Sequence, residues 1–300
     1  MELKTKMKLI RKEIVEEVRS IKSMAIILIL NVVLLLCVTT MFYSVMSGTS
    51  NGYTSNYKAV LYMYNNLIFI EFIVILIVIP LIAGASYARE FESGTLDLLL
   101  LTSLRTEDIL MAKIARVITF NMFLVLTTLP MLCVVFSVGG VGVWDILKYI
   151  IIVFSTTLFF GSIGVYFSVK FEDSLKGVMA TFLVEIIGTI GIQGLLKVIY
   201  MIADRIKNMT FYSGSGDAAY NKLQFSNLGT FLIVNPMYDI FKLQSDIVGS
   251  KSSYDIMMND FGVHPVLEKI WIFVSVIIFI IVAIFMINKT KKMLLKKFGK

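Results

Sequence analysis

The stretch YAREFESGTLDLLLLTSL, residues 87–104, lies between two long apolar segments of the chain. It combines a charged cluster, formed by Arg89, Glu90 and Glu92, with a run of four leucines at 98–101. A loop that only connected two membrane spans would need neither feature. We interpret the stretch as a docking element for a second protein, because apolar residues flanked by charges are typical of protein-binding surfaces.

The composition of the chain indicates a membrane protein. Of its 300 residues, 57% are hydrophobic and only 16% are charged, whereas a soluble domain has roughly 45–50% and about 25%. A net charge of +7 could indicate nucleic-acid binding in a soluble chain, but Lys and Arg here must first be assigned to a side of the membrane. We therefore predict an all-α membrane protein that contacts lipid and has no nucleic-acid partner.

Six apolar stretches are long enough to cross a bilayer, since a spanning helix needs about 20 residues. They are 24–46, 66–87, 111–138, 147–169, 177–203 and 269–288. We expect them to form one membrane domain, residues 24–300, preceded by a charged leader, residues 1–23.

Basic residues predict how the chain is oriented. The leader carries seven and residues 289–300 carry six, whereas the short connections 47–65 and 139–146 share a single lysine, Lys58. Because Lys and Arg collect on cytoplasmic flanks, we expect a multi-pass protein of the cytoplasmic membrane with both termini in the cytoplasm. The connection 204–268 then lies outside, and its length predicts an extracellular cap with structure of its own before the last span.

The leader has the pattern of an amphipathic helix. Apolar residues recur at three- and four-residue spacing, at Leu3, Met7, Ile10, Ile14, Val18 and Ile21. Such a helix can be simply an anchor in the cytoplasmic interface. An anchor for anionic lipid would gain nothing from acids on its polar face, however, so we also expect Glu13 and Glu17 to contribute to contact with a cytosolic partner.

Helix-ending and helix-capping residues divide the stretch after the second span. Gly94 is expected to end a helix, and Thr95 can cap a new short helix with Asp97 in its first turn. A further helix is predicted to begin at Thr106 and to continue into the third span. The predicted result is a short helix held across the cytoplasmic end of the spans.

Residues 87–113 resemble the first cytoplasmic loop of type-2 ABC transporter permeases. The matching residues are Arg89, Glu90, Glu92, Ser93, Gly94, Thr95, Leu96, Leu98, Leu99, Leu100, Leu101 and Lys113. The resemblance implies that the loop 88–110 carries a coupling helix, which in this family rests in a cleft of the ATP-binding subunit. The leader resembles the elbow helix of the family. One departure is Ser103-Leu104, where relatives often have Pro, so the turn geometry stays open.

The resemblance implies the membrane-spanning subunit of an ATP-driven exporter. No G-x-x-x-x-G-K-[ST] phosphate loop occurs in the chain, so we expect ATP and Mg to bind a separate P-loop ATPase subunit. We expect no catalytic residue, metal site or cofactor on this chain. A second permease subunit, identical or different, would complete the transporter, and the sequence does not indicate the substrate.

Two other functional classes were compared with this one. A peptide-sensing or antimicrobial-resistance module would use the same architecture without classical transport, and a large outer cap would suit peptide capture. A membrane enzyme is disfavoured, because the chain has no H-E-x-x-H pair and its one histidine, His264, lies in the outer connection.

Four polar residues within the apolar stretches are candidates for a substrate path: Glu71, Glu185, Asn31 and Gln193. A carboxylate in hydrocarbon costs at least ~2.5 kcal/mol, so such residues usually face the bundle interior or a watery path. Hydrogen bonding between helices is the alternative role.

Overall fold

The computed structural model describes residues 2–47, 53–95, 106–138, 141–212, 232–248 and 265–298. Within these residues the chain is helical and contains no strand, which confirms the all-α prediction. The leucines of the expected coupling helix, Leu96, Leu98, Leu99, Leu100 and Leu101, lie outside the described residues.

The helices follow one another along the chain, and most are long. They are α1 (Glu2–Val18), α2 (Ile21–Ser47), α3 (Tyr53–Ala83), α4 (Ala88–Glu92), α6 (Thr106–Val138), α7 (Val143–Phe171), α8 (Ser174–Ile186), the π-helical turn η2 (Ile187–Gly191), α9 (Ile192–Tyr212), α10 (Pro236–Val248) and α12 (Pro265–Phe298).

Six segments of the described chain are long and apolar enough to cross a membrane, as predicted. They are Ile21–Thr40, Leu61–Glu92, Thr106–Cys133, Val143–Phe171, Ser174–Ile199 and Ile270–Lys297. The protein is therefore a multi-pass membrane protein by the length and composition of its helices.

The helices extend beyond the predicted spans. The second span was predicted to begin at 66, but α3 begins at Tyr53, and α12 continues to Phe298 rather than ending at 288. The first span was predicted from 24, and α2 begins at Ile21. Hydropathy locates only the part of a helix in the hydrocarbon, whereas the backbone hydrogen bonds continue into more polar surroundings.

The fifth span and the connection after it also differ from expectation. A π-helical turn at Ile187–Gly191 interrupts the span between α8 and α9. The connection predicted as 204–268 is shorter, since α9 continues to Tyr212 and α12 begins at Pro265. A helix begins at Pro236 within this connection, and the Asn235 side-chain oxygen caps it by accepting the backbone N–H of Met237 at 2.9 Å.

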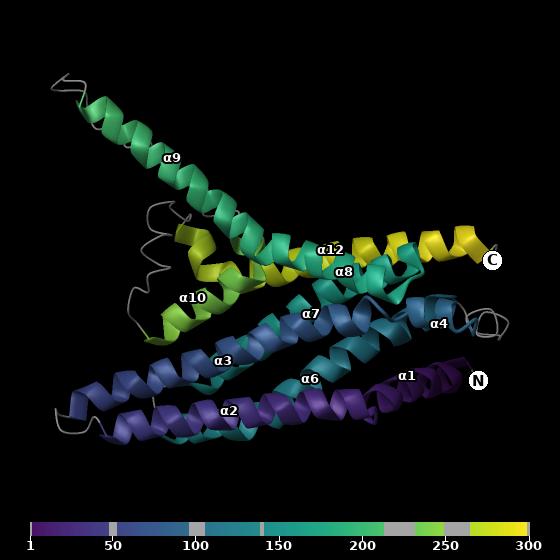
Figure 1. Cartoon of the computed structure of the whole chain (residues 1–300), viewed down its shortest axis with the longest axis horizontal. Coiled ribbons are helices and arrows are strands. Elements are labelled where there is room, and N and C mark those ends of the chain that lie inside the picture. The colour runs from purple at the N-terminus through teal and green to yellow at the C-terminus, as the bar shows by residue number, and fades with distance from the viewer. Residues whose placement is uncertain are drawn as a thin grey trace. The chain divides into compact units, whose positions relative to one another are not determined.

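The described chain forms two compact units, of which the first comprises Met1–Leu183 and Phe279–Lys300. In this unit α3, α6 and α7 pack against one another, and α1 and α2 pack along α6 (Figure 1). The aromatic side chains of Phe72, Phe120 and Phe160 are almost completely buried in these three central helices. The core of the unit is thus a three-helix packing to which the first two helices are added.

Glycines bring two helices of the first unit into backbone contact. A Cβ atom built on Gly177 would lie 2.3 Å from the carbonyl oxygen of Gly84, and one on Gly84 would lie 2.8 Å from the Cα of Val178. Gly164 of α7 is equally constrained, because a Cβ there would lie 2.6 Å from the Cβ of Ala83. Only glycine fits at these positions, so the end of α3 meets the start of α8 with no side chain between them.

The second unit, Val184–Ile278, contains α9, α10 and the π-helical turn. The Asn235 amide donates a hydrogen bond to the Thr189 carbonyl at 2.7 Å, which joins the start of α10 to the turn. The Tyr238 and Trp271 rings meet edge to face, with their centroids 6.4 Å apart. These contacts fix α10 within its own unit.

Candidate functional site

Helix α4 begins the stretch that resembles a coupling loop, and α7 holds its first turn. The Ser168 hydroxyl oxygen accepts the backbone N–H groups of Tyr87 at 2.8 Å and Ala88 at 2.9 Å. These are among the donors that a helix start leaves without a partner. Gly94 then ends the short helix with a left-handed φ of +66°, as predicted from its lack of a side chain.

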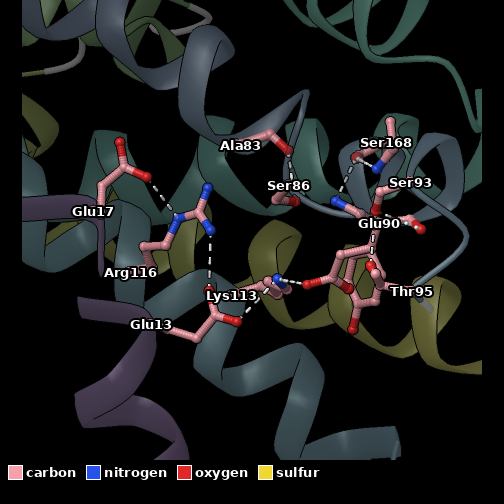
Figure 2. A network of polar contacts seen from close by, with 12 residues as sticks. Glu13, Glu17, Ala83, Ser86, Glu90, Ser93, Thr95, Lys113, Arg116 and Ser168 are labelled. Atoms are coloured by element: carbon pink, nitrogen blue, oxygen red, sulfur yellow. Dashed lines mark hydrogen bonds and ion pairs between the residues drawn. The ribbon is translucent and has the colours of Figure 1, made fainter. Parts of the chain in front are cut away.

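A buried network of ions joins α4 to the leader helix and to α6 (Figure 2). The Lys113 ammonium donates to Glu13 at 3.0 Å and also contacts Glu90. The Arg116 guanidinium contacts Glu13 and Glu17, each at 3.0 Å. We call these five residues, Glu13, Glu17, Glu90, Lys113 and Arg116, the ion network.

Lys113 and Glu13 of the ion network are buried, so their charges must be compensated by one another and by Arg116 rather than by water. Lys113 is only 2% exposed and Glu13 only 7%. Burial by itself would raise the pKa of Glu13, but the charges and hydrogen bonds of Lys113 and Arg116 outweigh burial and hold that pKa below its ordinary value of 4.5. Glu13 is therefore an ionised carboxylate that neutralises two buried bases.

Glu92 connects the same stretch to the fifth span. Its carboxylate accepts the backbone N–H of Ser174 at 2.6 Å and the Ser174 hydroxyl at 2.9 Å. Ser174 is the first residue of α8, where the N–H groups are free and the helix dipole favours negative charge. An acid from one loop thus caps the helix that follows another loop.

The last helix reaches this region as well. Lys297 of α12 forms an ion pair with Glu172 and lies 4.2 Å from the centroid of the Phe91 ring. Lys291 of the same helix pairs with Glu107 in the first turn of α6. Figure 1 shows α4, the start of α1 and the end of α12 at one end of the first unit.

The structure separates the predicted coupling residues into two groups. Glu13, Glu17 and Glu90 come together in the ion network. Arg89, Glu92, Gly94 and Thr95 are exposed, as a partner contact would require. Both oxygens of Glu13 are engaged within the chain, so any contribution of Glu13 to a partner contact is indirect.

Sequence reasoning did not identify the residues that hold the stretch in place. The sequence places Lys113 only within a motif, and it indicates no role for Arg116, Ser168 or Ser174. The pairing of Glu13 with Lys113 joins residues 100 positions apart, which no local spacing reveals. The available signal was two bases one helical turn apart near the start of a predicted span, with acids on the leader helix.

Two substrate-path candidates contact α6 within the first unit. Glu71 is fully buried, and one oxygen of its carboxyl group accepts a hydrogen bond from the Thr128 hydroxyl. Asn31 donates to the Ile27 carbonyl at 2.8 Å and to the Thr127 hydroxyl at 3.2 Å. Both residues hydrogen-bond another helix, which agrees with the alternative role given to them.

The other two candidates lie in the second unit, on either side of the π-helical turn. Glu185 is 3% exposed, and neither of its carboxylate oxygens accepts a hydrogen bond from the described residues. The Gln193 amide nitrogen is likewise buried without a hydrogen-bond partner there. A π-helical turn is rare and is often found at functional sites, so this pair keeps its place as a candidate.

Among the described residues, no three His, Cys, Asp or Glu side chains are grouped so that they could hold a metal ion. Comparison with the models of known protein families and with curated proteins found no match. The chain is therefore interpreted from its residue pattern at 87–113 and from the contacts around α4.

Proposed function

We propose that this protein is the membrane-spanning subunit of an ATP-binding cassette exporter of the cytoplasmic membrane. A separate P-loop ATPase subunit would bind ATP and Mg and would dock on the loop 88–110. A second permease subunit, identical or different, would complete the path for the substrate. No catalytic role is assigned to this chain.

One observation carries the proposal: residues 87–95 are joined to four other helices at the same end of the first unit. Backbone N–H groups of this stretch bind Ser168 of α7, and Glu90 binds Lys113 of α6. Glu92 caps α8, and Phe91 lies against Lys297 of α12. A displacement of the loop would thus be passed to several spans together.

The ion network would let a small displacement of α4 move α6 and the leader helix with it. Charged groups held by two or more partners in a buried place cannot separate cheaply, because each would leave an uncompensated charge behind. Lys113 is shared by Glu13 and Glu90, so α4, α6 and the leader helix move as one body. Closure of an ATPase dimer would then favour one of two arrangements of the spans.

The first test is co-purification of the tagged chain, in mild detergent, from cells that express it at its natural level. We expect a P-loop ATPase among the recovered proteins, identified by mass spectrometry. Recovery of this chain without any ATPase, both with ATP and with a non-hydrolysable analogue, would contradict the proposal.

A variant sharpens the test by changing the docking loop alone. Glu92→Lys with Leu99→Asp is expected to insert normally into the membrane and to lose the ATPase. The control Asp145→Lys with Val143→Asp also changes one acid to lysine and one aliphatic residue to aspartate. These residues lie at the start of α7, far along the helix from Ser168, so the control should retain the ATPase. Ser174→Ala, which removes one of the two Glu92 contacts, shows how much of any loss comes from the cap of α8.

ATP-dependent movement of a substrate distinguishes export from peptide sensing. Both functions predict a bound ATPase, but only an exporter moves the compound across sealed vesicles when ATP is hydrolysed. Protection of cells from a peptide, without any such flux, would favour the sensing or resistance module.

A further inference from the structure

The leader helix presents a second face, opposite to the one that enters the ion network. Four basic residues, Lys8, Arg11, Lys12 and Arg19, are exposed along it. Together with Val15, Glu16 and Ser20 they line a hollow of about 580 Å³. Four bases and one acid leave this hollow with three positive charges.

An apolar groove runs between α2 and α6 in the same unit, with a volume of about 550 Å³. Its walls are formed by Met24, Leu28 and Leu35 on one side and by Phe123 and Met131 on the other. The polar groups at its surface are those of Asn31 and Thr127, which hydrogen-bond each other. Both helices belong to segments that can cross the membrane, so an apolar ligand would reach the groove from the bilayer.

The two hollows are neighbours along the chain, on either side of the junction of α1 and α2. Arg19 and Ser20 close the basic hollow, while Val18 and Met24 begin the apolar groove. A basic hollow on α1 is thus followed along the chain by an apolar groove on α2, within a segment that can cross the membrane. The chemistry required of a ligand is a negative head group joined to a hydrocarbon chain.

We infer that this combined surface is a binding site for an anionic phospholipid, with its phosphate at Arg11, Lys12 and Arg19 and an acyl chain in the α2–α6 groove. Basic groups at the cytoplasmic ends of membrane helices attract anionic head groups, and long Lys and Arg side chains can reach them from the apolar boundary. The inference requires no ATPase partner.

The site has a consequence for the ion network. The same helix carries the basic hollow on one face and Glu13 and Glu17 on the other, where they bind Lys113 and Arg116. A lipid that fixes the outer face would hold the inner face against α6. Loss of the lipid should therefore loosen α1 without altering any residue of the network.

The experiment uses the full-length chain in nanodiscs of phosphatidylcholine, with and without phosphatidylglycerol, and native mass spectrometry to count retained lipids. We expect retained phosphatidylglycerol in the unmodified protein and at least a tenfold loss in Arg11→Gln/Lys12→Gln/Arg19→Gln. The control Lys176→Gln/Lys292→Gln/Lys296→Gln removes the same charge elsewhere and should retain the lipid. Equal loss in both triple variants, or no preference for phosphatidylglycerol, would overturn the site.

A second variant tests the groove without changing the charge. Leu35→Trp fills the groove and is expected to reduce lipid retention, whereas retention equal to that of the unmodified protein would overturn the placement of the acyl chain. Photoactivatable phosphatidylglycerol gives a readout that does not depend on either variant folding. We expect labels within 24–35 and 123–131, and labels spread equally over α12 would contradict the inference. Inorganic phosphate, which lacks an acyl chain, should not displace the lipid.

Discussion

Two sets of acids in this protein, each wholly or partly shielded from solvent, have different surroundings. Glu13, Glu17 and Glu90, next to the loop that follows the second span, each lie against a lysine or an arginine. Glu71 and Glu185, within the spans, form no ion pair among the described residues, and Glu71 accepts its hydrogen bond from a threonine. The acids of the first set neutralise basic residues and join helices. The acids of the second set have no basic partner among the described residues, so they can act only as polar groups within the spans.

The largest effect is expected when the ion network loses its shared acid. Glu13→Gln leaves Lys113 and Arg116 buried with less negative charge, and breaking a buried pair in this way costs ~3–5 kcal/mol. Denaturation in detergent should show this loss of stability. Glu16→Gln on the exposed face of the same helix should change stability by less than ~0.5 kcal/mol. If Glu13→Gln lowered stability as little as Glu16→Gln does, the pairing of Glu13 with buried bases would not stabilise the fold, and the contrast between the two sets of acids would fail.

A smaller effect is expected when Glu71 loses its hydrogen-bond donor. Thr128→Val keeps the shape of the side chain but leaves a buried carboxyl oxygen without its partner, at a cost of ~1–3 kcal/mol. Thr40→Val removes an exposed hydroxyl that donates to carbonyls of its own helix, and it serves as the control. Equal costs for both variants would show that burial of Glu71 does not matter.

Acid should weaken the paired set. The pKa of Glu13 is lower in the folded chain than its ordinary value of 4.5, because Lys113 and Arg116 outweigh the effect of burial. Its contribution to stability is thus complete above pH 4.5 and is lost as the pH falls through the lowered pKa. Unfolding measured between about pH 6 and pH 3 should show this loss in the unmodified chain. If Glu13→Gln shows the same decline, other carboxylates are responsible.

The smallest effect is expected for Glu71→Gln. Glutamine keeps an oxygen that can accept from Thr128, so stability should change by no more than ~1 kcal/mol. The same chemical change at Glu13 is expected to cost several times as much. A large loss for Glu71→Gln would show that this carboxyl must carry a charge, and transport by the variant would then be the next measurement.

Local signals predicted much of the fold. Hydropathy located six spans, Gly94 ended a helix as expected, and the helix predicted to begin at Thr106 does so. The ends of α3 and α12 were predicted less well, because helices continue past the hydrocarbon region. The π-helical turn in the fifth span has no pattern that would have revealed it.

The candidate site was predicted only in part, for a physical reason. Glu90 and Glu92 were identified from their neighbours in the sequence, but their roles come from Lys113 and Ser174, which reach them through folding. Glu13 was assigned to a partner surface because acids on a basic helix are unusual. Its true neighbours became clear only when α1 was seen along α6.

The close approach of Gly84 to Gly177 has a consequence for the order in which contacts form during synthesis of the chain. Residue 84 leaves the ribosome long before residue 177, so the end of α3 lacks its contact with α8 while the third and fourth spans are being made. The hydrogen bond between Glu92 and Ser174 also cannot form until residue 174 has been synthesised. Because chains emerge from the N-terminus first, the segment 84–95 gains these two contacts only after the fifth span begins to be made. This part of the chain is therefore synthesised early but gains its full set of contacts late.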